Sequence, residues 1–311
     1  MKELINLSSY PVNVVIKNLL KDKTTKKNII FATNAYTEIN DSINEKTQIT
    51  LELLNVLGTK LIQPRVSRSI EQQAERTRKK AEVFTPSWIC NKMNNHCDAE
   101  WFGRNSVFNT EIEHDWIVNT EKIQFDNFNG WQKYVDSRRL EITCGEAPYI
   151  VSRYDVATGE IIQIKKRIGI LDRKIRVVNE NTDNEAEWLK WVLRAFQSVY
   201  GYEFQGDNLL IARINLLNTY VDYMQDRWKR IPTDKELKKI TNIIVWNFWQ
   251  MDGISGMVPF KTNVKKYEQI SLFDFTIEDN SLEEKEVDVN CKIYDWRSNE
   301  SITYNSLKEG R

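Results

Sequence analysis

The feature that most limits the possible folds is a long apolar stripe in the second half of the chain. It steps by four and three residues through Leu210, Ile214, Leu217, Val221, Met224 and Trp228. This spacing places the side chains on one face of an α-helix of roughly five turns. Such a helix needs a large apolar surface to pack against. The chain supplies one, because 41% of its 311 residues are hydrophobic, a share that excludes overall disorder.

Two more helices are predicted on either side of this stripe. The apolar face of the first is made by Trp188, Val192, Phe196 and Val199. The second begins at Pro232 with a capping box formed by Thr233 and Glu236. Its apolar face is made by Leu237, Ile240, Ile244, Phe248 and Met251. We therefore expect a helix that continues through residue 251 and encloses Asn247.

Short strands are predicted before and after these helices. Residues 140–150 form a short strand that runs into a turn with Gly145 and Pro148. Residues 159–178 alternate and contain β-branched runs, which predicts a hairpin-like insertion near 154–185. Residues 291–304 predict two short strands around a polar turn, and residues 278–288 an acidic linker. Between residues 100 and 140, the indole rings of Trp101, Trp116 and Trp131 are expected in the core.

Charge and cysteine content narrow the class of protein. Lys and Arg balance Asp and Glu at 44 each, so any basic surface must be local. The four cysteines imply no disulfide framework, which favours a reducing cytoplasm. No apolar run is long enough for a membrane helix, and no signal peptide is visible, so we expect a soluble cytoplasmic protein without a membrane partner.

One segment is locally basic. Residues 65–80 predict a solvent-exposed helix that would contact phosphates if the protein binds double-stranded DNA. The expected DNA-binding side chains are Arg65, Arg68, Arg76, Arg78, Lys79 and Lys80. An equally simple interpretation is a solvated surface without a partner.

Three segments together indicate a ligand-binding site, and none of them does so alone. The first ends in Phe84-Thr85-Pro86. The second is a strand and turn from residue 141 to 149, where Gly145 lets the backbone approach a ligand closely. The third is a strand ending in Glu203, and an acid at such a strand end can bind ribose hydroxyls. We expect Gly145 and Glu203 to face one crevice.

In this order, and followed by Ala-Arg-x-Asn-Leu-Leu at 212–217, the segments resemble the γ-type adenine-N6 DNA methyltransferases, of the kind labelled restriction endonuclease subunit M. The resemblance covers residues 76–217 and implies an α/β fold: a Rossmann-like methyltransferase sheet with an N-terminal α+β extension. It implies S-adenosylmethionine as cofactor and a second methyltransferase or restriction subunit as partner. The cofactor-binding residues it implies are Phe84, Thr85, Pro86, Thr143, Cys144, Gly145, Glu146, Pro148, Tyr149 and Glu203.

The sequence departs from the family pattern in three places. The glycine turn of the family usually reads Pro-x-Cys-Gly-Ser-Gly, whereas Glu146 and Ala147 occupy its last two positions here. A carboxylate there would lie near that of the cofactor. Glu203 follows Gly145 at a separation far beyond the roughly 20 residues of a simple βαβ unit.

The third departure concerns the catalytic motif. Adenine-N6 transfer in this family requires Asn or Asp followed by Pro-Pro and an aromatic residue, which together hold the flipped base. No two of the six prolines are adjacent. The nearest imitation begins at Asn247, within the predicted third helix. The sequence therefore predicts a methyltransferase part that is inactive on its own, and no catalytic residue can be assigned.

Four alternatives stay open. One is a non-catalytic DNA- or protein-binding module built on a methyltransferase-like shell, and another is a complete enzyme that uses Asn247. Cys90, His96 and Cys97 suggest a zinc site only weakly, because a fourth ligand is missing. A metal-dependent nuclease strand ending in Lys165 lacks the acid expected at Gln163. We divide the chain into an extension (1–82), a Rossmann-like cofactor-binding domain (83–260), and a linker with a short β-hairpin (261–311).

Overall fold

The computed structural model describes residues 4–80, 82–126, 130–260, 262–265 and 284–309. A small parallel sheet lies at its centre, with strands in the order β3 (Arg139–Ile142), β4 (Val199–Glu203) and β5 (Phe248–Gln250). Ile142 is paired with Tyr202, and Glu203 with Gln250, so the carboxyl ends of the strands meet at one edge. The described part is thus a mixed α/β structure.

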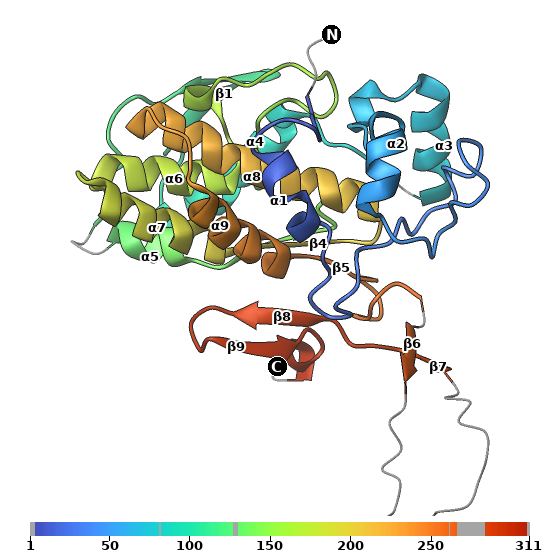
Figure 1. Cartoon of the computed structure of the whole chain (residues 1–311). Coiled ribbons are helices and arrows are strands. Elements are labelled where there is room, and N and C mark those ends of the chain that lie inside the picture. The colour runs from blue at the N-terminus through green and yellow to red at the C-terminus, as the bar shows by residue number, and fades with distance from the viewer. Residues whose placement is uncertain (1–3, 81, 127–129, 261, 266–283, 310–311) are drawn as a thin grey trace, which may run out of the picture.

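Helices connect the strands and cover one face of the sheet (Figure 1). The chain passes from β3 to β4 through η2 (Ile164–Lys166), α6 (Ile170–Asn181) and α7 (Glu185–Gln197). It passes from β4 to β5 through α8 (Gly206–Trp228) and α9 (Asp234–Asn247). The helix α8 carries the apolar stripe and is buried along most of its length, as the spacing predicts. On this face of the sheet, Val199 and Phe248 belong to the main core.

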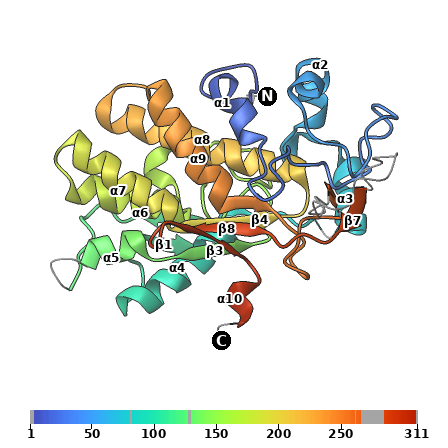
Figure 2. The ribbon, with the colours of Figure 1, turned by 60° about the horizontal axis from the view of Figure 1, so that its bottom comes forward.

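A hairpin of β8 (Lys292–Asp295) and β9 (Glu300–Thr303), followed by α10 (Ser306–Glu309), lies against the opposite face (Figures 1 and 2). Tyr202 and Trp249 project to this side and pack on Cys291 and Ile293. The two predicted strands near the C-terminus are confirmed. Of the predicted acidic linker at 278–288, residues 278–283 lie outside the described residues. Residues 284–287 form the strand β7 (Glu284–Val287), which pairs with β6 (Thr262–Lys265), so the linker prediction is wrong there.

The predicted hairpin-like insertion is wrong for most of its length. Only an isolated bridge joins Tyr154 to Ile161, and residues 170–181 form α6. The β-branched Val177 and Val178 suggested a strand. Leu171, Ile175 and Val178 nevertheless keep helical spacing and are buried. The long separation between Gly145 and Glu203 is therefore filled by two helices.

Two smaller predictions also fail. Trp116 and Trp131 are buried as expected, but Trp101 is 42% exposed on α4 (Ser87–Phe102). The capping box of α9 is present, yet the helix ends at Asn247. Phe248 begins β5 instead, because its backbone pairs with Gly201 of β4. Helical spacing at residues 248 and 251 was coincidental.

The first 80 residues form α1 (Val12–Leu19), α2 (Leu51–Leu61), η1 (Arg65–Ser67) and α3 (Ile70–Lys80), joined by loops with isolated bridges. They do not build a core of their own, since Val12, Leu19 and Phe31 belong to the main core. The fully buried Arg213 of α8 connects the two parts. Its Nη1 donates to the carbonyl oxygens of Leu19 and Lys21, and its Nε to that of Phe248.

The remaining elements are α4, α5 (Gly130–Asp136) and the hairpin of β1 (Asn109–Ile112) and β2 (Asp115–Val118). On β3, Leu140 and Ile142 are 43% and 64% exposed. Their register partners are Tyr200 and Tyr202, so they lie on the face that carries the C-terminal hairpin. That face is covered over β4 and β5 but open over β3 among the described residues.

Glycine is required at position 206, the first residue of α8, because the backbone of Ile30 approaches it closely. A Cβ there would lie 2.0 Å from the carbonyl oxygen of Ile30. Ile30 cannot move aside easily, because the side chain of Gln250 binds both its amide (2.9 Å) and its carbonyl (2.8 Å). We expect Gly206→Ala to lower the free energy of unfolding by about 3 kcal/mol in denaturant titrations.

Gly58→Ala in α2 provides the matched control. There the new methyl would contact the end of the Leu7 side chain at 3.0 Å, and a flexible side chain can yield. An equal loss of stability in both variants would contradict the argument from backbone contact.

Candidate functional site

A sharp turn follows β3 at the carboxyl edge of the sheet. Gly145 and Ala147 both adopt positive φ angles, of 50° and 64°. The amide of Cys144 donates to the carbonyl of Tyr202 (2.9 Å), and the amide of Ala147 donates to the carbonyl of Cys144 (2.6 Å). The turn is therefore fixed between the ends of β3 and β4. Thr143 is exposed, and Pro148 and Tyr149 are half-buried.

Glu203 lies directly beneath this turn. Its Oε2 accepts a hydrogen bond from the amide of Gly145 at 2.9 Å. Its Oε1 accepts from the amides of Phe204 (2.9 Å) and Gln205 (3.1 Å). The expected proximity of Gly145 and Glu203 is confirmed. Each carboxylate oxygen can accept about two hydrogen bonds, so Oε2 keeps the capacity for one more.

Burial changes the ionisation of this acid. Glu203 is only 5% exposed, and desolvation raises its pKa to about 7, although the three backbone donors act in the opposite direction. An acid with this pKa changes its charge within the physiological range. Its capacity to accept hydrogen bonds from hydroxyl groups therefore depends on pH.

The segment Phe84-Thr85-Pro86 reaches the same turn from the other side. The Phe84 ring would lie 3.9 Å from a Cβ at Gly145, and the Arg65 guanidinium lies over this ring at 5.0 Å. Thr85 is hydrogen-bonded to the side chain of Tyr149. Pro86 directly precedes α4, so the segment ends where this helix begins. The three segments that the sequence singled out therefore meet at one place.

Glu146 is directed into the protein interior. It is 1% exposed, and its carboxylate accepts from the amide of Arg65 (2.6 Å) and the hydroxyl of Tyr154 (2.5 Å). Burial raises its pKa. Its carbonyl accepts from the side chain of Asn215 on α8 (3.1 Å). The Glu146 carboxylate therefore binds interior groups and fastens the turn to them. Its position does not favour the expected approach to the carboxylate of a cofactor.

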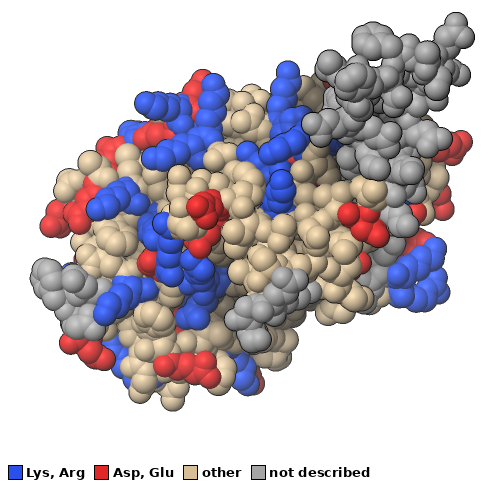
Figure 3. Space-filling model, turned by 90° about the horizontal axis from the view of Figure 1, so that it is seen from below, with Lys and Arg blue, Asp and Glu red and all other residues tan. Residues whose placement is uncertain are grey.

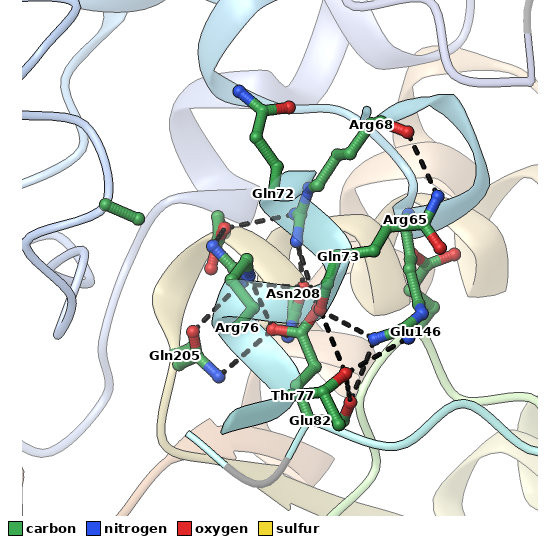
Figure 4. Close-up of polar contacts among 12 residues, drawn as sticks. Arg65, Arg68, Gln72, Gln73, Arg76, Thr77, Glu82, Glu146, Gln205 and Asn208 are labelled. Atoms are coloured by element: carbon green, nitrogen blue, oxygen red, sulfur yellow. Dashed lines mark hydrogen bonds and ion pairs between the residues drawn. The ribbon is translucent and has the colours of Figure 1, made fainter. Parts of the chain in front are cut away.

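The basic segment takes a different role from the expected one (Figure 4). Residues 70–80 are helical, but Arg68 and Arg76 are 8% and 5% exposed, so the prediction of a fully solvent-exposed basic helix is wrong. Both arginines form ion pairs with Glu82 and with Asp207 on α8, at 2.6–3.2 Å. A run of basic residues does not reveal an acidic partner that is distant in the sequence, such as Asp207.

The other basic side chains of this segment differ in exposure. Arg65 is half-buried, and its Nη1 donates to the backbone carbonyl of Glu82 (2.8 Å). Arg78 and Lys79 are exposed, and Lys79 pairs with Glu75. The side chain of Lys80 lies outside the described residues. The buried cluster thus fastens α3 and the start of the Phe84 segment to the first turn of α8.

Asp252 was not singled out because the pattern predicted a helix through residue 251 and so hid the strand end that precedes it. It follows β5, the third strand of the parallel sheet, at the same carboxyl edge as Gly145 and Glu203. Its carboxylate accepts from the amide of Ile254 (2.9 Å) and the hydroxyl of Ser255 (3.0 Å). An acid two residues after a short apolar run would have been the signal, had that run been recognised as a strand.

Asn247 is fully buried and bonded to protein groups, so a base has no access to its side chain. Its amide nitrogen donates to the carbonyls of Phe196 (3.0 Å) and Val199 (2.9 Å). Its Oδ1 accepts from the indole of Trp296 (2.7 Å), and the residue is fully buried. Its role in the described structure is to join α7, α9 and the C-terminal hairpin.

The weaker sequence hypotheses gain nothing from the geometry. Among the described residues, no group of three or more His, Cys, Asp or Glu side chains is placed to hold a metal ion. Cys90 and Cys144 are buried, and burial raises the pKa of both thiols, which disfavours the reactive thiolate. Lys165 lies in η2 and not in a strand. None of the helices in the described ranges is both long and apolar enough to cross a membrane.

Comparisons with protein-family models, with curated proteins and with solved structures give no match to this chain.

Proposed function

We propose that this chain is the S-adenosylmethionine-binding part of a DNA adenine-N6 methyltransferase of a bacterial restriction-modification system. The observation that carries the proposal is the meeting of three distant segments: Phe84 against Gly145, and Gly145 hydrogen-bonded to Glu203. A glycine turn beside a strand-end acid suits a nucleoside with an attached amino acid. In this proposal the sheet is the first half of a Rossmann-like methyltransferase sheet.

Within the proposal, each part has a role. The glycine turn would hold the methionine part of the cofactor, and Glu203 would accept hydrogen bonds from the ribose through the remaining capacity of Oε2. Phe84, Thr85 and Pro86 would close the crevice from the side of α4. When bound, the cofactor would supply the methyl group. The protein residues would bind and orient it.

The proposal requires a partner, because the described residues offer no motif that could hold the target base. Asn247 is committed to Phe196, Val199 and Trp296, so the base-holding motif would come from a second methyltransferase or restriction subunit. Double-stranded DNA is the proposed substrate, in the cytoplasm. Basic side chains gather in several clusters on the hairpin side of the molecule, which supports this despite a net charge of zero (Figure 3).

The test is calorimetry of the whole chain with S-adenosylmethionine. We expect saturable binding, weakened at least about tenfold by Glu203→Gln, because the amide that replaces Oε2 or Oε1 cannot accept in its place. Glu300→Gln, on the exposed strand β9, is the matched control and should leave affinity unchanged. Absence of binding by the wild-type chain would favour the alternative, a DNA- or protein-binding module on a methyltransferase-like shell.

The pH dependence of this binding is a separate prediction. Ribose hydroxyls donate to the ionised form of Glu203, whose pKa is raised to about 7. Affinity should therefore be constant well above pH 7 and fall by about tenfold per pH unit below it. Calorimetric titrations at several pH values between about 5.5 and 8.5, on both sides of this pKa, would measure the change in affinity. A flat profile would show that the carboxylate of Glu203 does not contact the cofactor.

A further inference from the structure

A second cavity lies away from the crevice, between the β1–β2 hairpin, the η2 turn, α6 and the end of α8. Its volume is about 340 Å³, at the lower end of the range for small-molecule sites. Its apolar wall is formed by Phe108, Trp116 and Tyr223, all of which are buried. None of the residues assigned to the proposed cofactor crevice lines this cavity.

The η2 wall of the cavity is cationic. Lys165, Lys166 and Arg167 are consecutive and all line it. Lys165 is exposed and has no ion-pair partner among the described residues. Lys166 reaches Asp115 only at 3.5 Å, with both side chains about half exposed, so this pair is weak.

Arg167 differs from the two lysines because it is buried. Its side chain is 5% exposed, and its Nη2 donates to Asp222 (2.6 Å). Its Nη1 has no hydrogen-bond partner within the described part of the chain. A buried donor without a partner is unfavourable, so an acceptor on a ligand would be stabilised there. Asp222 also binds Arg153 (3.0 Å), and Asp172 lies close enough to Arg167 to raise the pKa of its guanidinium, so these two cations face two carboxylates.

The acids of the cavity do not offset the charges of Lys165 and Lys166. Glu180 accepts from Arg176 (2.7 Å) and from the amide of Ile123 (2.8 Å). Asp172, the carboxylate near Arg167, accepts from the amide (2.9 Å) and hydroxyl (3.1 Å) of Ser152. Asp226 is the one lining acid for which the described residues offer no side-chain partner. The cations that are free for a ligand, Lys165 and Lys166 above all, therefore outnumber the free acids.

We propose that this cavity binds a nucleoside monophosphate, with the phosphate at Lys165, Lys166 and Arg167 and the base toward the aromatic wall. A phosphate monoester carries nearly two negative charges at neutral pH and accepts several hydrogen bonds, which matches clustered Lys and Arg donors. The volume admits one nucleotide but no oligonucleotide. This site is independent of the proposed methyltransferase function, because it shares no residue with the cofactor crevice.

The probe is cytidine 5′-monophosphate, because adenine nucleotides contain the part of S-adenosylmethionine that the other crevice would bind. Calorimetry on the whole chain should give a dissociation constant below about 1 mM, as an order-of-magnitude expectation for a small ligand with charge-assisted contacts. Ribose 5-phosphate has the same charge without the base and should bind at least about fivefold more weakly, because it leaves the aromatic wall uncovered.

Variants then locate the site. Lys165→Ala combined with Lys166→Ala should weaken binding of the nucleotide at least about tenfold, and both residues are exposed enough to be replaced without unfolding. Lys239→Ala, on the exposed face of α9, is the matched control. Glu203→Gln should leave nucleotide binding intact, which separates this site from the cofactor crevice. No saturation by about 10 mM would overturn the proposal, as would a double variant that binds like the wild type, or equal affinities for the nucleotide and ribose 5-phosphate.

Discussion

Replacing Glu82 by glutamine is expected to lower the free energy of unfolding by about 3–5 kcal/mol, the usual cost of removing one partner from a buried ion pair. Glu82 is 7% exposed and contacts Arg68 at 3.1 Å and Arg76 at 2.6 Å. With a neutral side chain at this position, two buried guanidinium groups would share only Asp207. The shift of the denaturant midpoint in chemical unfolding measures the effect.

The control for this substitution is Glu75→Gln on the neighbouring helix α3. Glu75 is exposed and pairs with Lys79, which is also exposed, so its loss should change stability by less than about 1 kcal/mol. If both variants unfold at the same denaturant concentration, the buried cluster does not stabilise the fold as argued. The cluster also holds the residues just before Phe84, so Glu82→Gln should weaken cofactor binding if the proposed function is correct.

The second large effect is on activity. The purified chain is expected to transfer no labelled methyl groups to mixed-sequence duplex DNA above background. The side chain of Asn247 is fully buried and bonded to three protein groups, and no two prolines are adjacent anywhere in the sequence. Positioning of the reacting groups supplies much of the acceleration by enzymes, so loss of the base clamp should abolish the reaction rather than reduce it slightly.

The assay requires a positive control, because a damaged protein would also show no methyl transfer. Adding a partner subunit that carries the Asn-Pro-Pro-Tyr motif should restore methyl transfer, and Glu203→Gln should reduce the restored rate. Robust transfer by the chain alone, lost on Asn247→Ala, would show that Asn247 leaves its three partners and acts on the base. That outcome would replace the proposed incomplete enzyme with a complete one.

The sequence was most informative where one local pattern was enough. The spacing from Leu210 to Trp228 identified α8, and the pair Thr233 and Glu236 located the start of α9. The two strand ends at Gly145 and Glu203 were placed in one crevice because parallel strands end at a common edge. These inferences need only periodicity, capping and the general rule for parallel sheets.

The sequence was misleading where distant contacts overrode local preference. Val177 and Val178 favour a strand, but burial of the apolar face of α6 outweighs that preference. Phe248 continues a helical pattern, but pairing with β4 makes it a strand residue. Arg68 and Arg76 suggested a solvated surface, and only the fold reveals their contacts with Glu82 and Asp207. Each error concerns tertiary contacts that a local sequence pattern does not reveal.

The position of Arg213 has a practical consequence for attempts to isolate the cofactor-binding region. Its guanidinium is buried between the end of α1 and the start of β5, bound to Leu19 and Phe248. A truncated protein that begins at residue 83 would leave this cation facing an emptied groove, with Ile30 no longer present to pair with Gln250. Such a fragment should be degraded rapidly by proteases, so the smallest autonomous folding unit includes α1 and the loop through Phe31.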